Sequence, residues 1–264
     1  MIRTPLMNVT TAAVLKAGRG LKHDLGEIEN LQVSSKGPGD FVSLADKRSE
    51  KTLYEELSKA RPGYGFVMEE SGRVEGTDKS HTWHIDPLDA TTNFLHAIPI
   101  FAISVALERE GQIVAGVVYN PANDDMYITE KGQGAWGNNH RLRVAQRSEL
   151  SESLIGCGIP HLGKSAEHPQ FKADLAVVMT RVVNVRRLVC ASIDLAYVAA
   201  GRFDAFWERG LHSWDIAAGT LLIREAGGYV SDCDGKPDFL TTGSICGGNE
   251  AIHRQMLQLL AQAH

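Results

Sequence analysis

The sequence predicts a mixed α/β protein built in two parts. Apolar residues recur at helical spacing in the first 60 residues, and short apolar runs between residues 66 and 129 indicate strands that follow one another directly. Near residues 146–153 the pattern changes to alternating helices and strands. With 264 residues, 43% of them hydrophobic, the chain can bury a core as one large or two small domains. We therefore expect an N-terminal subdomain, 1–147, and a C-terminal subdomain, 148–264.

The N-terminal subdomain is expected to begin with two helices. The apolar stripe predicts a helix over residues 5–23, and a second helix starts at Asp46 and ends near residues 61–63. The segment Gly37-Pro38-Gly39 breaks the chain between them. On local grounds Asp46 is an acid stabilised by the helix dipole. Apolar runs then predict strands over residues 66–68, 83–86, 101–107, 113–119 and 126–129.

The C-terminal subdomain is expected to alternate helices and strands. One further helix has Ser213 as its N-cap and Gly227 just beyond its end, which puts Asp215 in its first turn. The remaining patterns predict strands over residues 154–157, 203–208, 229–231 and 244–246, and helices over residues 171–183, 192–200 and 251–261.

The segment 84–94, HIDPLDATTNF, contains the main candidate ligands for a functional site. Pro87 restricts the residue before it to extended geometry, so Asp86 should close a strand and Asp89 should lie on the following turn. The next four residues, 90–93, offer hydroxyls and free backbone N–H groups at the start of a short helix, where an anion can be held. The segment therefore predicts cations on one side and a phosphate on the other.

Four acids stand at predicted element boundaries and supply the oxygen ligands that Mg²⁺ prefers: Glu69, Asp86, Asp89 and Asp215. Neighbouring strand residues face opposite ways, so only one of Glu69 and Glu70 can point into a given pocket. The chain has no GxSxG, P-loop lysine or HExxH motif. These residues predict Mg²⁺-dependent phosphate chemistry.

Composition excludes several other classes of function. The net charge is −5 and no basic run is longer than Arg186-Arg187, so direct nucleic-acid binding is not indicated. No apolar run approaches the roughly 18 residues of a membrane span, and the first 22 residues do not resemble a signal peptide. The four cysteines are far apart and form no CxxC, which argues against a zinc site and fits a reduced compartment. We expect a cytoplasmic enzyme with a small ligand.

Five segments of this sequence resemble a known family. Residues 40–46, 69–71, 86–94 and 214–219 are similar, in order and spacing, to the motifs of the inositol monophosphatase family, and residues 195–202 resemble its bacterial branch. The resemblance implies the αβαβα sandwich typical of the inositol monophosphatase/fructose bisphosphatase superfamily. It also implies a homodimer, two or three Mg²⁺ ions in each active site, inhibition by Li⁺, and hydrolysis of inositol monophosphate or a related polyol phosphate.

The resemblance also implies a metal-ligand set. One Mg²⁺ would be held by Glu69, Asp86 and the carbonyl of Leu88. A second would be held by Asp86, Asp89 and Asp215. Glu69 would help to hold a third, weaker ion through water. Metal bridging would neutralise the phosphate, and a water of lowered pKa would attack phosphorus in line with the ester oxygen.

By the same resemblance, Asp46 polarises Thr91, and this pair orients and deprotonates the attacking water, with Glu69 as the third catalytic residue. Backbone N–H groups of Ala90 and Thr91 would hold the phosphate. The alcohol part of the substrate would contact Asp89, Glu208 and the main chain of Ala191.

Two departures from the family pattern bear on function. Relatives have Gly at the position of Ala90, so the phosphate site is strained unless this residue is near-helical. Relatives also have Gly and then a small or hydroxyl residue where this chain has Val189 and Cys190, beside the leaving alcohol. Substrate preference should therefore change more than chemistry. Two alternatives stay open: another ester (histidinol phosphate, fructose 1,6-bisphosphate or a 3′-phosphoadenosine nucleotide), or a regulatory protein associated with the transcription machinery.

Overall fold

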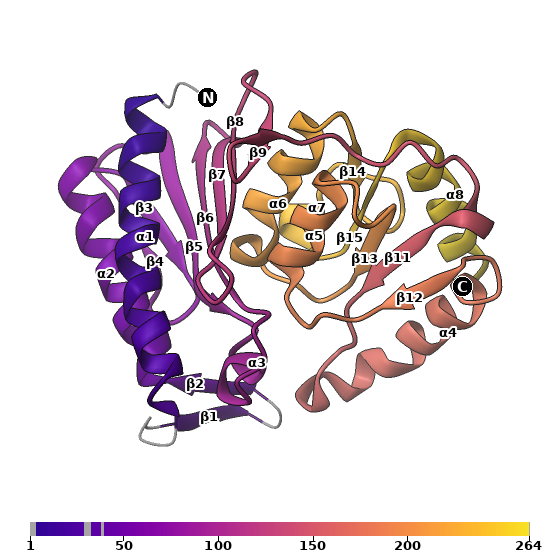
Figure 1. Cartoon of the computed structure of the whole chain (residues 1–264), viewed down its shortest axis with the longest axis horizontal. Coiled ribbons are helices and arrows are strands. Elements are labelled where there is room, and N and C mark those ends of the chain that lie inside the picture. Colours follow the sequence, from indigo (N-terminus) through magenta and orange to yellow (C-terminus); the bar gives the residue numbers. More distant parts are fainter. Residues whose placement is uncertain (1–3, 29–32, 38–39, 264) are drawn as a thin grey trace.

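Helices and sheets alternate in five layers (Figure 1). The computed structural model describes residues 4–28, 33–37 and 40–263. Helices α1 (Pro5–Leu25) and α2 (Leu44–Ala60) cover the outer face of a large sheet, and α5 (Ala191–Ala199) and α6 (Ser213–Glu225) lie between the two sheets. The outer face of the small sheet is covered by α4 (His168–Val178) and α8 (Glu250–Leu260). The predicted αβαβα sandwich is confirmed.

The large sheet has the strand order β10-β9-β8-β7-β6-β5-β3-β4, and only the β3–β5 pairing is parallel. Its strands are β3 (Gly65–Met68), β4 (Gly72–Val74), β5 (His81–Asp89), β6 (Ala102–Arg109), β7 (Gln112–Asn120), β8 (Asp125–Glu130), β9 (Ala135–Gly137) and β10 (His140–Arg141). The expectation that Asp86 closes its strand is wrong. Strand β5 continues to Asp89, because the pairing with β6 shifts register between these two acids instead of ending.

A two-stranded sheet, β1 (Val33–Gly37) and β2 (Asp40–Ser43), precedes α2. The predicted break at Gly37-Pro38-Gly39 falls partly outside the described residues, since Pro38 and Gly39 are not among them.

The small sheet has the order β12-β11-β13-β15-β14, parallel across its first three strands and antiparallel across the rest. Its strands are β11 (Leu154–Cys157), β12 (Asn184–Arg186), β13 (Ala205–Glu208), β14 (Tyr229–Ser231) and β15 (Ile245–Gly248). The chain leaves the large sheet after Arg141 and enters the small one at Leu154. The division into subdomains at residues 147 and 148 stays a prediction.

The predicted boundaries of two helices are wrong. Helix α4 begins at His168 and ends at Val178, because Pro169 fits the first helical turn and residues 179–183 turn toward β12. In α6 the N-cap is His212, and Ser213 is the first helical residue. Short helices complete the fold: α3 (Thr91–Leu95), α7 (Phe239–Thr242), η2 (Leu150–Glu152), η3 (Leu162–Glu167) and η4 (Ala261–Ala263).

Strand β5 sends its side chains into two different layers. Trp83 and Ile85 are fully buried in the cluster beneath α1 and α2. The residues that alternate with them, His84 and Asp86, face the opposite layer, which contains α6, because successive strand residues point to opposite faces. The acid is thereby placed between the two sheets. No helix in the described part of the chain has the length and apolar character needed to span a membrane.

Candidate active site

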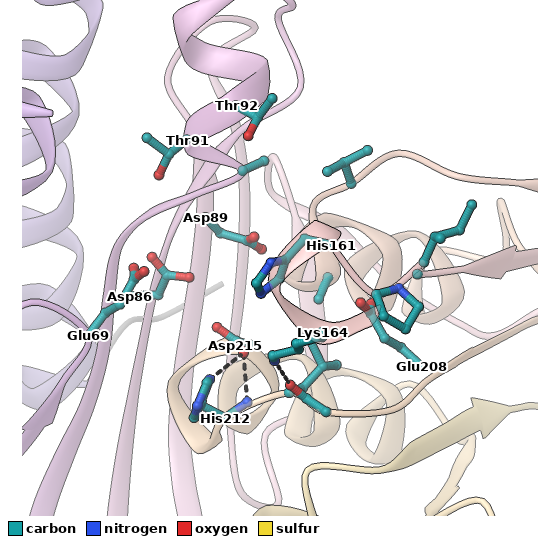
Figure 2. Close-up of a pocket in the computed structure, with 18 of the residues that line it drawn as sticks. Glu69, Asp86, Asp89, Thr91, Thr92, His161, Lys164, Glu208, His212 and Asp215 are labelled. Carbon is teal, nitrogen blue, oxygen red and sulfur yellow. Dashed lines mark hydrogen bonds and ion pairs between the residues drawn. The ribbon is translucent and has the colours of Figure 1, made fainter. Parts of the chain in front are cut away.

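A pocket of about 450 Å³ lies between the two sheets, where β5, α3, α5, β13 and α6 meet. Figure 2 shows Glu69, Asp86 and Asp89 on one side of it and Asp215 on another, with Glu208 farther along the wall. Every predicted site residue except Asp46 lines this pocket: Glu69, Asp86, Leu88, Asp89, Ala90, Thr91, Ala191, Glu208 and Asp215. Glu70 points instead into a separate surface hollow beside α2.

The four acids at the pocket repel one another. Burial raises the pKa of Asp86 well above its ordinary value, and the nearby carboxylates of Glu69, Asp89 and Asp215 raise it further. Burial and then Asp215 raise the pKa of Asp89 to about 6, against hydrogen bonds from Ser192 that lower it. Such a cluster is costly without a cation to neutralise it.

The donor set fits a hard divalent cation, because all of its side-chain donors are carboxylate oxygens and they face one space. In the described residues, no three His, Cys, Asp or Glu side chains already converge as a closed metal site. These side chains must therefore move closer together before three of them can share an ion.

The position of Asp89 is set by the start of α5. Its Oδ2 accepts hydrogen bonds from the backbone N–H of Ser192 at 2.8 Å, from the Ser192 hydroxyl at 2.6 Å and from Cys190 Sγ at 3.3 Å. Its other carboxylate oxygen is left for the pocket. Cys190 thus contacts the acid cluster directly, although its side chain is fully buried.

Asp46 lies behind the pocket and contacts it through Thr91. The Thr91 hydroxyl is 2.9 Å from Asp46 Oδ1 and 3.1 Å from the carbonyl oxygen of Leu88. Asp46 Oδ2 accepts hydrogen bonds from the backbone N–H and the hydroxyl of Ser43, in the capping box of α2. Burial nevertheless raises the pKa of Asp46. The acid is therefore both a helix cap and the partner of Thr91.

Two residues at the pocket have left-handed backbones that glycine would adopt more easily. Ala90, the N-cap of α3, has φ 72° and ψ 48°, and Val189 has φ 68°. The condition that made Ala90 tolerable, a near-helical backbone, is not met. Each residue carries strain of roughly 1–2 kcal/mol, and a β-branched side chain makes Val189 the rarer case.

Glu208 ends β13 and fills the space beside Gly158. A Cβ at Gly158 would lie 1.8 Å from Glu208 Cδ, so only glycine leaves room for this carboxyl. Burial, followed by Asp215 and Asp89, raises the pKa of Glu208 to about 8, and the positive charges of Lys164 and Arg187 offset part of this.

Several residues that line the pocket were missed from the sequence: His161, Lys164, Arg187, His212 and Trp214. His212 stacks on Trp214 at 4.5 Å between ring centroids, and its backbone N–H donates to Asp215 Oδ2 at 2.7 Å. His212 and Trp214 could have been identified from the sequence, because they lie within three residues of Asp215. Lys164, in the short helix η3, hydrogen-bonds the carbonyl of Gly210, and no motif in its part of the sequence gave a signal.

The chain is similar to known proteins along its length. Residues 3–264 match the inositol monophosphatase family. The inositol-1-monophosphatase of Mesorhizobium japonicum is 61% identical over 258 residues, covering 98% of this chain and 97% of the relative. The Nus factor SuhB of Escherichia coli K12 is 38% identical, covering 96% and 94%. The crystal structure of extragenic suppressor protein suhB from Bartonella henselae has a TM-score of 0.95 at 50% identity, covering 97% and 98%.

Proposed function

Because the chain belongs to the inositol monophosphatase family, we propose that it is a Mg²⁺-dependent phosphomonoesterase acting on inositol monophosphate. One observation carries this proposal. Carboxylates from three separate segments of the chain face a single pocket. They belong to Glu69, to Asp86 and Asp89, and to Asp215. A relative named inositol-1-monophosphatase, at 61% identity over nearly the whole chain, supports the choice of substrate.

Two or three Mg²⁺ ions would be held by the residues that share this pocket: Glu69, Asp86, Asp89, Asp215 and the carbonyl of Leu88. Bound Mg²⁺ supplies positive charge against the phosphate and lowers the pKa of a water molecule. Burial and then the neighbouring carboxylates raise the pKa values of Asp86 and Asp89, and this supports the assignment, since a bound cation favours the ionised carboxylates and offsets both causes.

Thr91 and Asp46 would guide the attacking water, with Glu69 beside them. While the Thr91 hydroxyl donates its hydrogen to Asp46, its lone pairs stay free to accept a hydrogen bond from water in the pocket. The proton of the water can then pass to Thr91 as the Thr91 proton passes to Asp46. The hydrogen bonds from Ser43 hold Asp46 in place during this exchange.

The remaining assignments concern the substrate. The backbone N–H groups of Ala90 and Thr91 would donate to the phosphate at the start of α3. Asp89, Glu208 and the main chain of Ala191 would contact the alcohol, and all three residues line the same pocket. A polyol suits a carboxyl such as Glu208, whose raised pKa lets it both donate and accept hydrogen bonds.

The test is phosphate release from inositol 1-phosphate, with and without Mg²⁺. Asp89→Asn should lose metal-dependent release by several orders of magnitude while its circular dichroism stays that of the wild type. The exposed Asp234→Asn is the matched control and should remain active. Release by Asp89→Asn near the wild-type rate would reject the proposal. Histidinol phosphate, fructose 1,6-bisphosphate and a 3′-phosphoadenosine nucleotide complete the panel that decides the substrate.

We also propose a homodimer that is inhibited by Li⁺ and works in the cytoplasm. Large apolar side chains exposed near the pocket entrance and beyond α4 support association: Ile159, Leu162, Met179 and Val183.

Four free, buried cysteines fit a reducing compartment. Light scattering should give twice the chain mass, and Li⁺ should lower phosphate release.

The second candidate is a regulatory protein on the same fold that associates with transcription machinery. Its support is the 38% identical relative named Nus factor SuhB, together with the strained backbones at Ala90 and Val189. The two candidates separate in one measurement. A chain that binds neither Mg²⁺ nor phosphate by calorimetry would favour the regulatory function.

A further inference from the structure

A buried histidine connects the large sheet to helix α6. His84 is 6% exposed; its Nδ1 lies 2.8 Å from Ser213 Oγ, and its Nε2 lies 3.0 Å from Glu108 Oε2. Ser213 begins α6 and Glu108 belongs to β6, so the three side chains join three elements. In the sequence, His84 and Ser213 are 129 residues apart.

The partners assign the hydrogen positions on this ring. An ionised Glu108 can only accept, so Nε2 carries a hydrogen and donates it. In the neutral imidazole, Nδ1 is then an acceptor, and the Ser213 hydroxyl donates to it. The bond to His84 also keeps the pKa of Glu108 below its ordinary value. Both ring nitrogens are therefore satisfied, and the ring orientation is fixed from two sides.

Each end of the His84–Ser213 bond lies two residues before a proposed metal ligand. His84 and Asp86 project from the same face of β5, because strand residues two apart share a face. Ser213 and Asp215 lie in the first turn of α6. A second bond acts nearby, from Ser104 Oγ on β6 to the carbonyl of Trp214 at 3.1 Å. Ser104 is paired with Asp86 across the sheet.

We propose that His84 and Ser213 are positioning residues that set the distance between Asp86 and Asp215, and with it the affinity for the Mg²⁺ these acids share. The inference rests on the function proposed above. Ligand bonds of about 2 Å tolerate little displacement, and Asp86 and Asp215 come from different layers. The His84–Ser213 bond fixes one layer against the other at the point where the ligands must meet.

The order hydroxyl, imidazole, carboxylate is also that of a hydrolase triad. That function is not supported, because Ser213 is not among the described residues that line the pocket. Its hydroxyl is hydrogen-bonded to His84, between the large sheet and α6. The connection to the metal site is the remaining role for these groups.

Calorimetric titration of the metal-free protein with Mg²⁺ alone tests the proposal. Asparagine can place an amide oxygen near the position of Nδ1, and glutamine can reach only the position of Nε2. His84→Asn should therefore keep the bond to Ser213 and bind Mg²⁺ within about threefold of the wild type. His84→Gln and Ser213→Ala should bind it about 10–100-fold more weakly.

Glu225→Ala is the matched control. Glu225 ends α6 and accepts hydrogen bonds from the backbone of Gly132 and Gly134, each at 2.8 Å, so its loss loosens the opposite end of the same helix. Thermal unfolding in EDTA should show that Glu225→Ala and Ser213→Ala lose similar stability, while only Ser213→Ala loses Mg²⁺ affinity.

The outcomes separate the two proposals. Wild-type affinity in both Ser213→Ala and His84→Gln overturns the positioning role and leaves the proposed function intact. Equal loss of affinity in Glu225→Ala also overturns it, because general loosening would then explain the effect. A wild-type protein that binds no Mg²⁺ overturns the proposed function and the positioning role together.

Discussion

The backbone at Ala90 stores strain at the point where the phosphate is proposed to bind. Its φ of 72° crowds Cβ against the backbone, and glycine has no Cβ to crowd. We expect Ala90→Gly to raise the free energy of unfolding by about 1 kcal/mol, since relief of strain outweighs the added freedom of the unfolded chain. Urea denaturation measures the difference.

A glycine placed where the backbone is right-handed should act in the opposite direction. Ala12 is an exposed residue of α1, and Ala12→Gly should lower stability by about 0.5–1 kcal/mol. A loss of stability in Ala90→Gly similar to that in Ala12→Gly would show that Ala90 is not strained.

Gly158 makes room for Glu208, so a single methyl group should displace the proposed alcohol contact. Gly158→Ala brings Cβ to 1.8 Å from Glu208 Cδ and forces this carboxyl to move. We expect kcat/KM for inositol 1-phosphate to fall about 10–100-fold, the cost of leaving a buried hydroxyl of the alcohol without its hydrogen-bond partner. Mg²⁺ affinity should stay near that of the wild type, because Glu208 is not a proposed ligand.

Gly20 offers the control for this substitution. A Cβ there meets nothing within 4 Å, and the residue lies inside α1, five residues before its end. Gly20→Ala should keep full activity and gain stability, since alanine favours a helix. Unchanged kinetics in Gly158→Ala would remove Glu208 from the alcohol site.

At the scale of elements, local patterns predicted most helices and strands, and errors arose where distant contacts decide the boundary. The apolar run of β11 and the glycine beyond the end of α6 are signals that act over a few residues. Strand β11 lies where the pattern placed it, and α6 ends before Gly227 as predicted. Strand β5 runs past Pro87 because β6 continues to pair beyond a register shift. That partner lies outside any local window of sequence.

In the candidate site too, local sequence identified some residues, and contacts between distant segments decided the others. The four acids were identifiable because each stands at an element end and matches a family motif. His84 and Glu108 were not, because their connection to Ser213 requires β5, β6 and α6 to be packed together. Among the cations of the pocket wall, Lys164 lies in the short helix η3 and Arg187 directly follows β12, and neither belongs to a motif that relates it to the acids.

For the whole molecule, the acids between the layers should make metal-free stability depend on pH. Glu208 has a folded pKa of about 8, above the value near 4.3 expected in the unfolded chain. The folded state therefore binds the extra proton, so this contribution is complete below about pH 4 and is lost as pH rises toward 8. Asp89, with a pKa of about 6, adds the same trend at lower pH.

The interval between pH 6.5 and 8 includes the titration of Glu208, and buried Asp86 and Asp194, whose pKa values burial also raises, add to the same trend. Burial lowers the pKa of His253, which costs stability only below pH 6.5, and Asp89 is mostly ionised above that pH. In EDTA, the melting temperature should fall across this interval. The free energy of unfolding should fall with it, by at most roughly 1.4 kcal/mol per pH unit for one group. Glu208→Gln should flatten the fall.

Mg²⁺ should reverse this trend, because the cation is attracted to ionised carboxylates and binding stabilises the folded state. With saturating Mg²⁺, the melting temperature should rise or stay level from pH 6.5 to 8, and the gap from the EDTA curve should widen with pH. Parallel curves with and without Mg²⁺ would show that the acids of the pocket do not hold the ion. The layered fold thus places these acids at a cost in stability, and the ion they are proposed to bind offsets that cost.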